Sequence, residues 1–477
     1  ETTVYVANRN GLLSAIERVS GTVRWEVPLD AGVHTHVWSS PAVAEQDNVL
    51  VIGIGGYGTR DNNISIPRSQ LETFRGRIEG IDTRDGKSLW KFETSPTPNG
   101  SGVAVWSSAA LDTTSKVAFI GTGNNYYRPV SMFSDSLVAI NYTTGMRVWH
   151  QQFTANDAWT VATVLEGGQD GDVGAAPNLF SIGERAAVGV GEKTGSYHVH
   201  DRATGAEIWK KRLTTGGYQG GVMAPAAYHD GVIYVISNNN TSNATVFALK
   251  AMNGDILWEE DLTDPSFGAP TIANGVLYVG DQAGNMWARD AMSGVELWKA
   301  RAPQGRGGGF SVVDGMVFTG YGFHFSESRR EPLMGGVIGF STSGTVMLEP
   351  GGPMSDCIPN TAVTSAATFT NVYQGVLCPL GCTKVCHSTS AEAGLNLEGK
   401  MVAYTSMVGV AAKGEACKPG GHVLVVQNNP TASVLHGKLT STPQCGVVMP
   451  PGASMSPVSP AQLDAVRAWI MAGAPNN

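Results

Sequence analysis

The residues best suited to chemistry in this 477-residue chain lie in the stretch CTKVCH, residues 382–387. All six cysteines come after residue 356. Two of them, Cys382 and Cys386, lie close together, and His387 directly follows Cys386. Two thiols can bond the vinyl groups of a porphyrin, and an adjacent imidazole can bind its iron. The pattern therefore predicts covalent attachment of haem c by Cys382 and Cys386, with His387 as the proximal iron ligand.

Two other uses of these residues are weighed against haem. The two cysteines are separated by three residues, whereas the usual attachment signal has two. Zinc is disfavoured because it would need paired Cys/His clusters and this chain has one. A disulfide between Cys382 and Cys386 stays open as the alternative.

The second axial ligand of the iron is expected in the stretch VVMPPGASM. Met449 precedes two prolines there, in a stiff loop suited to presenting a thioether. His422, His436 and Met455 are rival candidates. A core methionine is the plain alternative for Met449.

Four further cysteines, Cys357, Cys378, Cys417 and Cys445, allow three disulfide pairings. We expect Cys417–Cys445, which would pin the Met449 loop, and Cys357–Cys378. Disulfides and haem c both imply an oxidising location, so the protein is predicted to be periplasmic or secreted.

The cysteine-containing part is predicted to be a small α-helical domain over residues 357–477, after a Gly/Pro-rich linker at 347–356. Its last segment carries helix-start signals at Ser459, Pro460 and Gln462. Apolar residues at helical spacing follow, namely Leu463, Val466 and Ile470. With its closing AWIMAGAP, this part resembles the cytochrome c-like domains fused to bacterial exported enzymes.

Residues 1–346 contain a repeat that must build the rest of the molecule. A glycine, an alternating apolar run, an Asp or a substitute, a turn with glycine and a tryptophan recur in order. The six tryptophans are Trp25, Trp90, Trp149, Trp209, Trp258 and Trp298. A seventh copy, GGVIGFSTSGTVM, lacks the tryptophan. Two more strand-like runs precede most copies, so the sequence predicts an all-β propeller with seven visible blade repeats, eight being left open. The tryptophans are expected to fill the gaps between blades.

Several stretches are not explained by blade building. Trp106 and Asn124 lie in adjacent predicted strands, and an acidic, glycine-rich insertion carries Asp157 and Asp172. Lys193 lies in a strand-to-strand turn, GEKTG. Two glycine pairs in GGYQGG, residues 216–221, predict a close approach of backbone to something else.

These stretches and the tryptophan repeat resemble the quinoprotein propeller family, in particular its alcohol-oxidising branch of the poly(vinyl alcohol) dehydrogenase type. GTGNNY is similar to the segment that gives calcium an amide ligand, which would be Asn124. DGDVGAAPNLF is similar to the Asp-x-Asp-Phe-Gly-x-x-Pro segment with the catalytic base, which would be Asp172. GEKTG is similar to the Gln-Lys-Ser-Gly turn whose cation, here Lys193, meets a quinone.

The resemblance implies pyrroloquinoline quinone (PQQ) and calcium as cofactors. Calcium takes oxygen ligands such as Asn and Asp. Asp172 is the expected base, with Asp157 as its alternative, and Trp106 is expected to stack on the quinone. Each residue also has a plain reading: Asn124 could turn the chain, Asp172 could solubilise a loop, and Lys193 could be a solvated turn lysine.

The predicted function joins the two halves. An alcohol, polymeric ones included, would be oxidised at PQQ and calcium, and electrons would pass through haem c to an external acceptor such as a cytochrome. One departure favours an alternative, a quinone-free propeller scaffold carrying a haem c module: relatives often have two adjacent cysteines over the quinone, and this chain has Leu71 and Glu72 there.

Composition sets limits on these readings. The chain is 42% hydrophobic and 15% charged, and its 60 glycines suit a β protein with many tight turns. A net charge of −8 argues against nucleic acid as a partner. No apolar run approaches the roughly 18–20 residues needed to span a bilayer. The opening ETTVYVAN is strand-like, which predicts a processed or incomplete start.

Overall fold

The computed structural model describes most of the chain. The described residues are 2–8, 11–29, 35–56, 73–96, 101–160, 168–217, 219–240, 242–303, 305–322, 335–341, 363–364, 366–378, 380, 395, 397, 400–440, 443–446 and 458–476. The chain divides into two compact units, one of Glu1–Leu333 with Ile338–Met347 and one of Met334–Val337 with Leu348–Asn477. Each unit is described by itself below.

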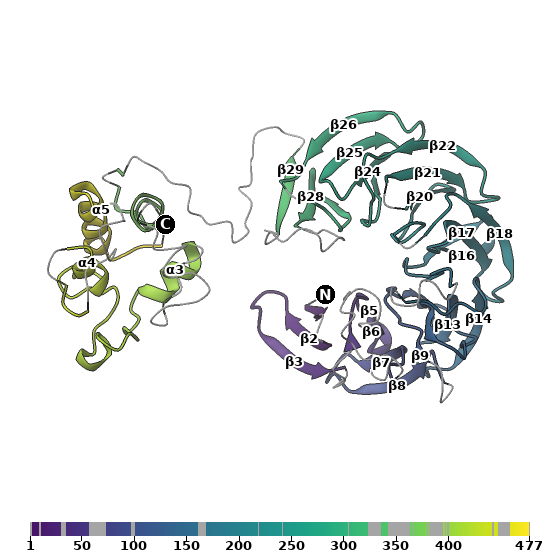
Figure 1. Ribbon diagram of the computed structural model, residues 1–477, viewed down its shortest axis with the longest axis horizontal. Coiled ribbons are helices and arrows are strands. Elements are labelled where there is room, and N and C mark those ends of the chain that lie inside the picture. Colours follow the sequence, from purple (N-terminus) through teal and green to yellow (C-terminus); the bar gives the residue numbers. More distant parts are fainter. Residues whose placement is uncertain are drawn as a thin grey trace. The chain divides into compact units, whose positions relative to one another are not determined.

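The first unit is a seven-bladed β-propeller, whose sheets follow one another around a ring in chain order (Figure 1). The first sheet is β1 (Thr3–Ala7), β2 (Leu12–Glu17) and β3 (Val23–Pro28). The second is β4 (Thr35–His36), β5 (Ala42–Ala44), β6 (Val49–Gly56), β7 (Arg77–Asp82) and β8 (Ser88–Glu93), with a short 3-10 turn at Glu45–Asp47. The third is β10 (Ala110–Asp112), β11 (Val117–Gly121), β13 (Ser136–Asn141) and β14 (Arg147–Gln152), with the small pair β9 (Ser101–Gly102) and β12 (Asn125–Tyr127) apart from it.

The remaining four sheets repeat the same antiparallel order. The fourth is β15 (Asn178–Ile182), β16 (Arg185–Gly191), β17 (Ser196–Asp201) and β18 (Glu207–Arg212). The fifth is β19 (Ala227–His229), β20 (Val232–Asn238), β21 (Ala244–Lys250) and β22 (Ile256–Asp261). The sixth is β23 (Thr271–Ala273), β24 (Val276–Gly280), β25 (Asn285–Asp290) and β26 (Glu296–Arg301), and the seventh is β27 (Phe310–Val313), β28 (Met316–Tyr321) and β29 (Gly336–Ser341). The propeller prediction is confirmed with seven blades.

The repeated tryptophans dock each blade on the next, as the sequence predicted. The indole nitrogen of Trp209, on β18, donates to the carbonyl of Ala251 in the following blade at 2.9 Å. The ring lies against Gly254, where a Cβ would come within 2.8 Å of it. The same donation joins Trp25 to Thr83, Trp90 to Tyr142, Trp149 to Arg202 and Trp258 to Ala291. Apolar clusters that join neighbouring sheets, such as Val199 and Trp209 with Ile233 and Leu249, bury the space between them.

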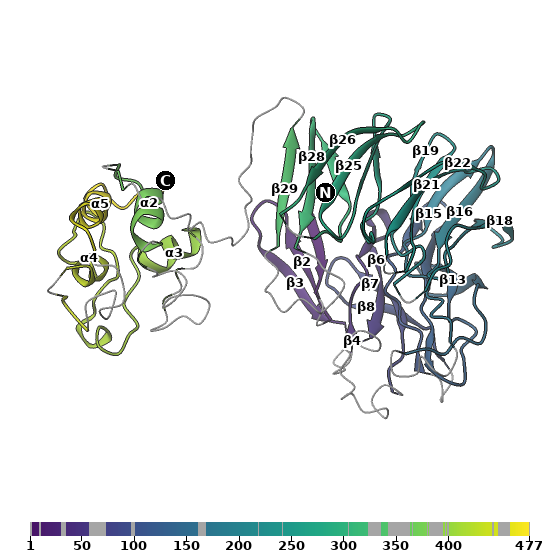
Figure 2. The same cartoon turned by 45° about the horizontal axis from the view of Figure 1, so that its top comes forward.

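The second unit contains short helices around its own apolar core. They are α2 (Phe369–Val372), a π-helical turn at Tyr373–Leu377, α3 (Lys400–Met407), a 3-10 turn at Lys418–Gly420, α4 (Val434–Lys438) and α5 (Pro460–Met471) (Figure 2). The predicted capping box of α5 is present, since Ser459 and Gln462 bond reciprocally. Val466 and Ile470 are fully buried and Leu463 packs against the same core, as their spacing predicted.

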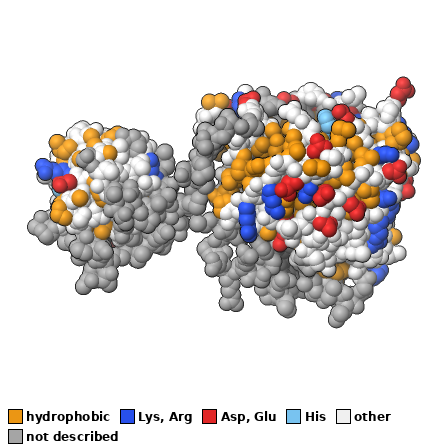
Figure 3. Space-filling view, turned by 90° about the horizontal axis from the view of Figure 1, so that it is seen from above, with side chains coloured by type: hydrophobic (Ala, Val, Ile, Leu, Met, Phe, Trp, Pro, Cys, Tyr) orange, Lys and Arg blue, Asp and Glu red, His pale blue; other side chains and the backbone are white. Residues whose placement is uncertain are grey.

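The described surface agrees with the sequence-based limits. Figure 3 shows Lys and Arg interspersed with Asp and Glu across one face of the propeller. Among the described residues, each helix is too short or too polar to cross a bilayer.

Two glycines provide a direct test of docking. Gly254 and Gly231 both have positive φ, at 73° and 78°, so alanine carries a similar backbone cost at each. A Cβ at Gly254 would meet Trp209, whereas nothing lies within 4 Å of one at Gly231. We expect Gly254→Ala to lower the free energy of unfolding by about 1–3 kcal/mol more than Gly231→Ala, through overpacking. Urea denaturation followed by tryptophan fluorescence measures this difference; equal losses would contradict the docking interpretation.

Candidate active site in the propeller

Three of the predicted site residues come together from three separate segments. Asn124 lies between β11 and β12, Asp172 lies in the loop before β15, and Lys193 lies in the turn between β16 and β17. The backbone amide of Asn124 donates to Oδ1 of Asp172 at 2.7 Å. The ammonium of Lys193 lies 3.3 Å from Oδ2 of the same aspartate. All three residues are buried, so none is the solvated loop or turn residue of the plain reading.

Glycines permit these approaches. A Cβ at Gly123 would lie 2.5 Å from Oδ1 of Asp172. Gly216 and Gly221 lie against the Lys193 turn, where a Cβ would come within 2.4 and 2.2 Å of the Lys193 carbonyl oxygen. The close approach predicted from the two glycine pairs is confirmed, and the segment approached is the turn that carries Lys193.

Two tryptophans stand beside this group. Trp106 is half-buried, and its ring lies so close to Gly174 that a Cβ there would be 1.7 Å from the indole. Trp159 is buried, and the Lys193 ammonium lies 5.7 Å from the centre of its ring, a cation–π distance. The sequence analysis singled out Trp106 and missed Trp159. The available signal was a tryptophan outside the blade repeat.

Asp157 is adjacent to the group but is already engaged by backbone. Its Oδ1 accepts from the amide of Gln169 at 2.9 Å and its Oδ2 from the amide of Gly171 at 2.8 Å. These bonds hold the loop that carries Asp172. Burial raises the pKa of Asp157, and the negative charge of Asp172 acts in the same direction.

Two further carboxylates were missed by the sequence analysis. Asp170 lies 2.5 Å from the Lys193 ammonium, and burial together with the charge of Asp172 raises its pKa to about 7. Asp135, at the start of β13, is fully buried, and neither of its oxygens has a hydrogen-bond partner among the described residues. Burial, with the charges of Asp157 and Asp172, raises the pKa of Asp135 well above its ordinary value. Its sequence signal was an acid directly before a strand with an apolar centre, Leu137–Ile140.

The charge balance of this cluster fits a cation. In the described part of the chain, four buried carboxylates, on Asp135, Asp157, Asp170 and Asp172, accompany one ammonium, on Lys193, so full ionisation of these residues leaves three negative charges (four minus one) uncompensated. Burying unpaired charge is costly, so the cluster must either retain protons or bind a cation. Calcium suits it, because calcium takes carboxylate and amide oxygens.

The amide of Asn124 is oriented in a way that suits this role. Its Nδ2 donates to the carbonyls of Asn125, at 2.6 Å, and Trp159, at 2.7 Å. Both amide hydrogens are thereby used, and the remaining polar atom is Oδ1, a possible calcium ligand.

The predicted haem residues are not among those that the structure describes. Cys382, Cys386, His387 and Met449 lie outside the described residues, as do Met455, Cys357, Leu71 and Glu72. Of the rival iron ligands, His436 lies on α4 and His422 follows the 3-10 turn. Burial lowers the pKa of His436.

The second unit nevertheless contains a ligand-sized cavity of about 590 Å³. Its walls are mainly apolar and include Leu377, Leu397, Met407, Leu424 and Leu435. Volumes of this order are typical of cofactor sites. Cys417 and Gly446 also line it.

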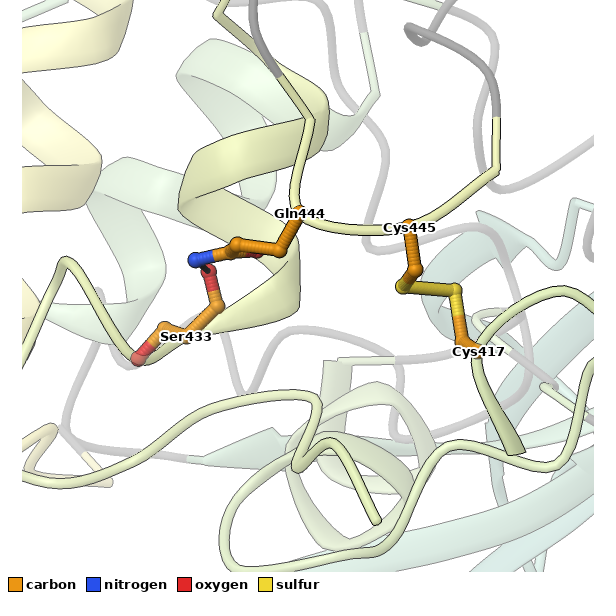
Figure 4. The surroundings of a disulfide bond; sticks show 4 residues. All are labelled: Cys417, Ser433, Gln444 and Cys445. Atoms are coloured by element: carbon orange, nitrogen blue, oxygen red, sulfur yellow. Dashed lines mark hydrogen bonds between the residues drawn. A yellow bond between two sulfur atoms is a disulfide. The ribbon is translucent and has the colours of Figure 1, made fainter. Parts of the chain in front are cut away.

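A disulfide fixes one wall of this cavity. The predicted Cys417–Cys445 bond is present, and Figure 4 shows it beside Gln444 and Ser433. The amide of Gln444 donates to the carbonyl of Ser433, at the start of α4, at 3.4 Å. The segment leading to the Met449 loop is therefore tied to two parts of the unit. Cys378 is also disulfide-bonded.

Comparison with known proteins defines the class of this propeller. Residues 20–226 match the family described as glucose/ethanol/alcohol dehydrogenase, beta-propeller domain, a PQQ family. Residues 193–344 match the family of the outer membrane protein assembly factor BamB. The chain therefore has a PQQ-dependent alcohol dehydrogenase-like propeller, and the predicted resemblance is confirmed for this part.

The curated relatives are more specific. Polyvinylalcohol dehydrogenase of Sphingopyxis sp. (strain 113P3) is 26% identical over 68% of this chain and 59% of its own length. Quinohemoprotein alcohol dehydrogenase ADH-IIG of Pseudomonas putida is 26% identical over 46% of this chain and 32% of its own length. The chain thus spans about three fifths of the length of the polyvinylalcohol dehydrogenases that it matches.

Solved structures share the fold. The quinohemoprotein alcohol dehydrogenase ADHIIG from Pseudomonas putida aligns with a TM-score of 0.60 and 21% identity, over 73% of this chain and 66% of that one. The quinohemoprotein alcohol dehydrogenase from Comamonas testosteroni aligns with a TM-score of 0.57 and 18% identity, over 99% of this chain and 80% of that one.

The acidic cluster predicts an unusual pH dependence. Asp135 and Asp170 have raised pKa values, so without a cation the folded propeller binds protons that the unfolded chain has released. Its stability should therefore fall as pH rises from about 4, the ordinary pKa of an aspartate, to about 7, the pKa of Asp170, by up to about 1.4 kcal/mol per pH unit for each proton.

Calcium should reduce this fall because it replaces the protons. Urea denaturation at several pH values, with chelator and with calcium, measures both slopes. Asp135→Asn should flatten the chelator slope, and Asp230→Asn, at an exposed carboxylate, should leave it unchanged. A wild-type slope of zero in chelator would contradict the cluster's proposed charge balance.

Proposed function

We propose that this protein is an exported quinohaemoprotein that oxidises an alcohol with PQQ and calcium in its propeller. Electrons would leave through haem c in the second unit to an external acceptor such as a cytochrome. The observation that carries the proposal is the buried cluster of Asp135, Asp170 and Asp172 around Lys193. Such an excess of buried carboxylate is stable only with a cation or bound protons.

Each residue of the cluster has a role that follows from its contacts. Asn124 and the neighbouring carboxylates would hold the calcium ion. Bound PQQ would supply a two-electron acceptor, polarised by that ion. Asp172 takes the hydroxyl proton of the alcohol, since its carboxylate is fixed by the Asn124 amide and by Lys193. Trp106, packed against Gly174, offers a flat wall for a planar ring.

Asp157 is the alternative base, and its contacts favour Asp172. Both oxygens of Asp157 accept backbone amides of the loop. These amides belong to the loop that carries Asp172, and Asp172 itself lies in the segment DGDVGAAPNLF, which is similar to the family segment with the base. We therefore assign Asp157 to positioning the loop.

Haem c attachment at Cys382 and Cys386, with His387 and Met449 as iron ligands, is supported indirectly. The apolar cavity of about 590 Å³ is suited to a porphyrin, and the Cys417–Cys445 disulfide ties down the segment before Met449. The likeness to the Comamonas testosteroni structure extends over 99% of the chain. The disulfides favour a periplasmic or secreted location.

The substrate proposal rests on the relatives. Two of them are named polyvinylalcohol dehydrogenase, at 26% and 25% identity. We therefore propose alcohols, including polymeric ones, as the substrate class.

A scaffold without quinone is the second candidate function. Leu71 and Glu72 stand where relatives often have adjacent cysteines, and residues 193–344 match the BamB family, an assembly factor by its description. In this case the haem module would be the only redox centre. Activity assays with and without PQQ and calcium separate the two candidates.

Substitution of the proposed base tests the first candidate. Asp172→Asn keeps an oxygen that can accept from the Asn124 amide but cannot take a proton. We expect unchanged PQQ binding and a fall in kcat of about a hundred- to ten-thousand-fold, measured with an artificial electron acceptor. Asp230→Asn serves as the control. Undiminished turnover would refute the role of Asp172, and an inactive wild type reconstituted with PQQ and calcium would favour the scaffold.

Haem attachment is tested separately. The denatured wild type should keep its porphyrin through acidified organic extraction, and Cys382→Ser with Cys386→Ser should lose it. Met449→Leu should remove the thioether–iron charge-transfer band, and Met455→Leu should keep it. Porphyrin that extracts fully from the wild type would end the haem c proposal.

A further inference from the structure

A second group of metal-binding side chains lies in the fourth blade. His198 and His200 are on β17, two residues apart, so their side chains lie on the same face of the strand. Glu207 on β18 is paired directly with His200. The potential ligand atoms of the three residues all lie within 4.8 Å of one another.

The tautomer of His200 is set by the backbone. Its Nδ1 lies 3.0 Å from the carbonyl oxygen of Gly205, which can only accept, so Nδ1 carries the proton. The lone pair is then on Nε2, which is buried and has no hydrogen-bond partner among the described residues. A histidine that donates one N–H to a carbonyl and presents the other nitrogen is the usual arrangement of a metal ligand. Burial also lowers the pKa of His200, which keeps the ring neutral.

His198 is oriented by a carboxylate. Its Nε2 lies 3.1 Å from Oε1 of Glu192, which also accepts from the hydroxyl of Thr194. This is an ion-pair distance, and neither ring nitrogen of His198 makes a hydrogen bond of good geometry among the described residues. A neutral ring with its proton on Nε2, toward the carboxylate, presents the lone pair of Nδ1. Nδ1 is buried, and in the described part of the chain it has no hydrogen-bond partner. Carboxylate–histidine pairs of this kind orient ligands in metal sites.

Packing alone does not explain a histidine at position 200. In six of the seven sheets a bulge lies at the same point, between the last two strands. The residues equivalent to His200 at these bulges are Ile16, Ile81, Ile140, Leu249 and Arg289. Four of the five are aliphatic, so an apolar side chain is sufficient for packing at this position of the blade.

Aromatic packing accounts for part of the environment. Phe153 stacks on His198 with ring centres 3.8 Å apart and planes 5° apart. This contact explains why the His198 ring is buried. Stacking engages only the face of the ring, so it does not occupy the in-plane nitrogens, which are the atoms that bind metals.

We propose that His198, His200 and Glu207 form a binding site for a divalent transition metal of the zinc type. Two imidazoles and a carboxylate are a ligand set that zinc accepts, with a fourth position left for water. The exposed side chain of Glu207 gives the ion a route from solvent. The site uses none of the carboxylates of the Asp172 cluster, so it is independent of the proposed dehydrogenase function.

Binding can be measured on the full-length, tag-free protein loaded with calcium. Titration calorimetry with zinc should show a site with a Kd of about 1 μM or tighter. Cobalt should give the visible absorption of a low-coordinate nitrogen-ligated ion. Glu207→Gln and His198→Gln should each weaken zinc binding at least about tenfold.

The repeat supplies a substitution that should preserve the fold. His200→Ile places at this position the residue found in three other blades, so the melting temperature without metal should be retained while this zinc site is lost. His229→Gln, at a surface histidine paired with Asp230, is the matched control and should bind zinc as the wild type does. Wild-type protein that fails to bind zinc below about 100 μM, or His200→Ile protein that binds it equally tightly, would overturn the proposal.

Discussion

The contact between a tryptophan on one blade and a glycine turn on the next organises the whole propeller. Trp209 illustrates it: the indole covers Gly254 and donates to the carbonyl of Ala251. The turn must have positive φ and no Cβ, so glycine is required for two reasons at once. Because five such contacts join successive blades, the positions of the loops in the middle of the ring are set by contacts at its rim.

Because these contacts at the rim fix the blades, the centre of the ring can contain an unfavourable distribution of charge. Asp135, Asp170 and Asp172 are buried together, and among the residues that the structure describes Lys193 is their one counter-ion. A flexible pocket would relax by admitting water or by turning the side chains outward. Here Gly123 packs closely against the carboxylate of Asp172, and Gly221 packs against the backbone of Lys193, so the two groups have little room to move. The rigid blades thus hold together a buried net negative charge that a bound cation would compensate.

The fold was predictable because a sequence repeat encodes each blade. Each copy carries its own strand alternation, turn glycine and tryptophan, and these local signals agree with one another. The same is true of α5, where Ser459, Gln462 and the apolar spacing define the start and the buried face. The Cys417–Cys445 disulfide was also predicted correctly, from its place before the Met449 loop.

The site was only partly predictable, for a physical reason. Asn124, Asp172 and Lys193 lie in segments that depart from the repeat, and they could be found by that departure. Asp135 directly precedes an ordinary blade strand, β13. It could not be recognised as a site residue because the charged residues around it, Asp157 and Asp172, are distant in sequence. His198 and His200 were hidden similarly, because the YHVHD stretch keeps the alternation of the blade.

The turn after β16 carries two neighbouring side chains that serve different groups. Glu192 contacts His198, and Lys193 contacts Asp170 and Asp172. Because the two residues are neighbours in one tight turn, inserting or deleting a residue here would displace the acid from the imidazole and the amine from the carboxylates together. The length of this turn is therefore constrained by two groups at once, the carboxylates on one side and the imidazole on the other.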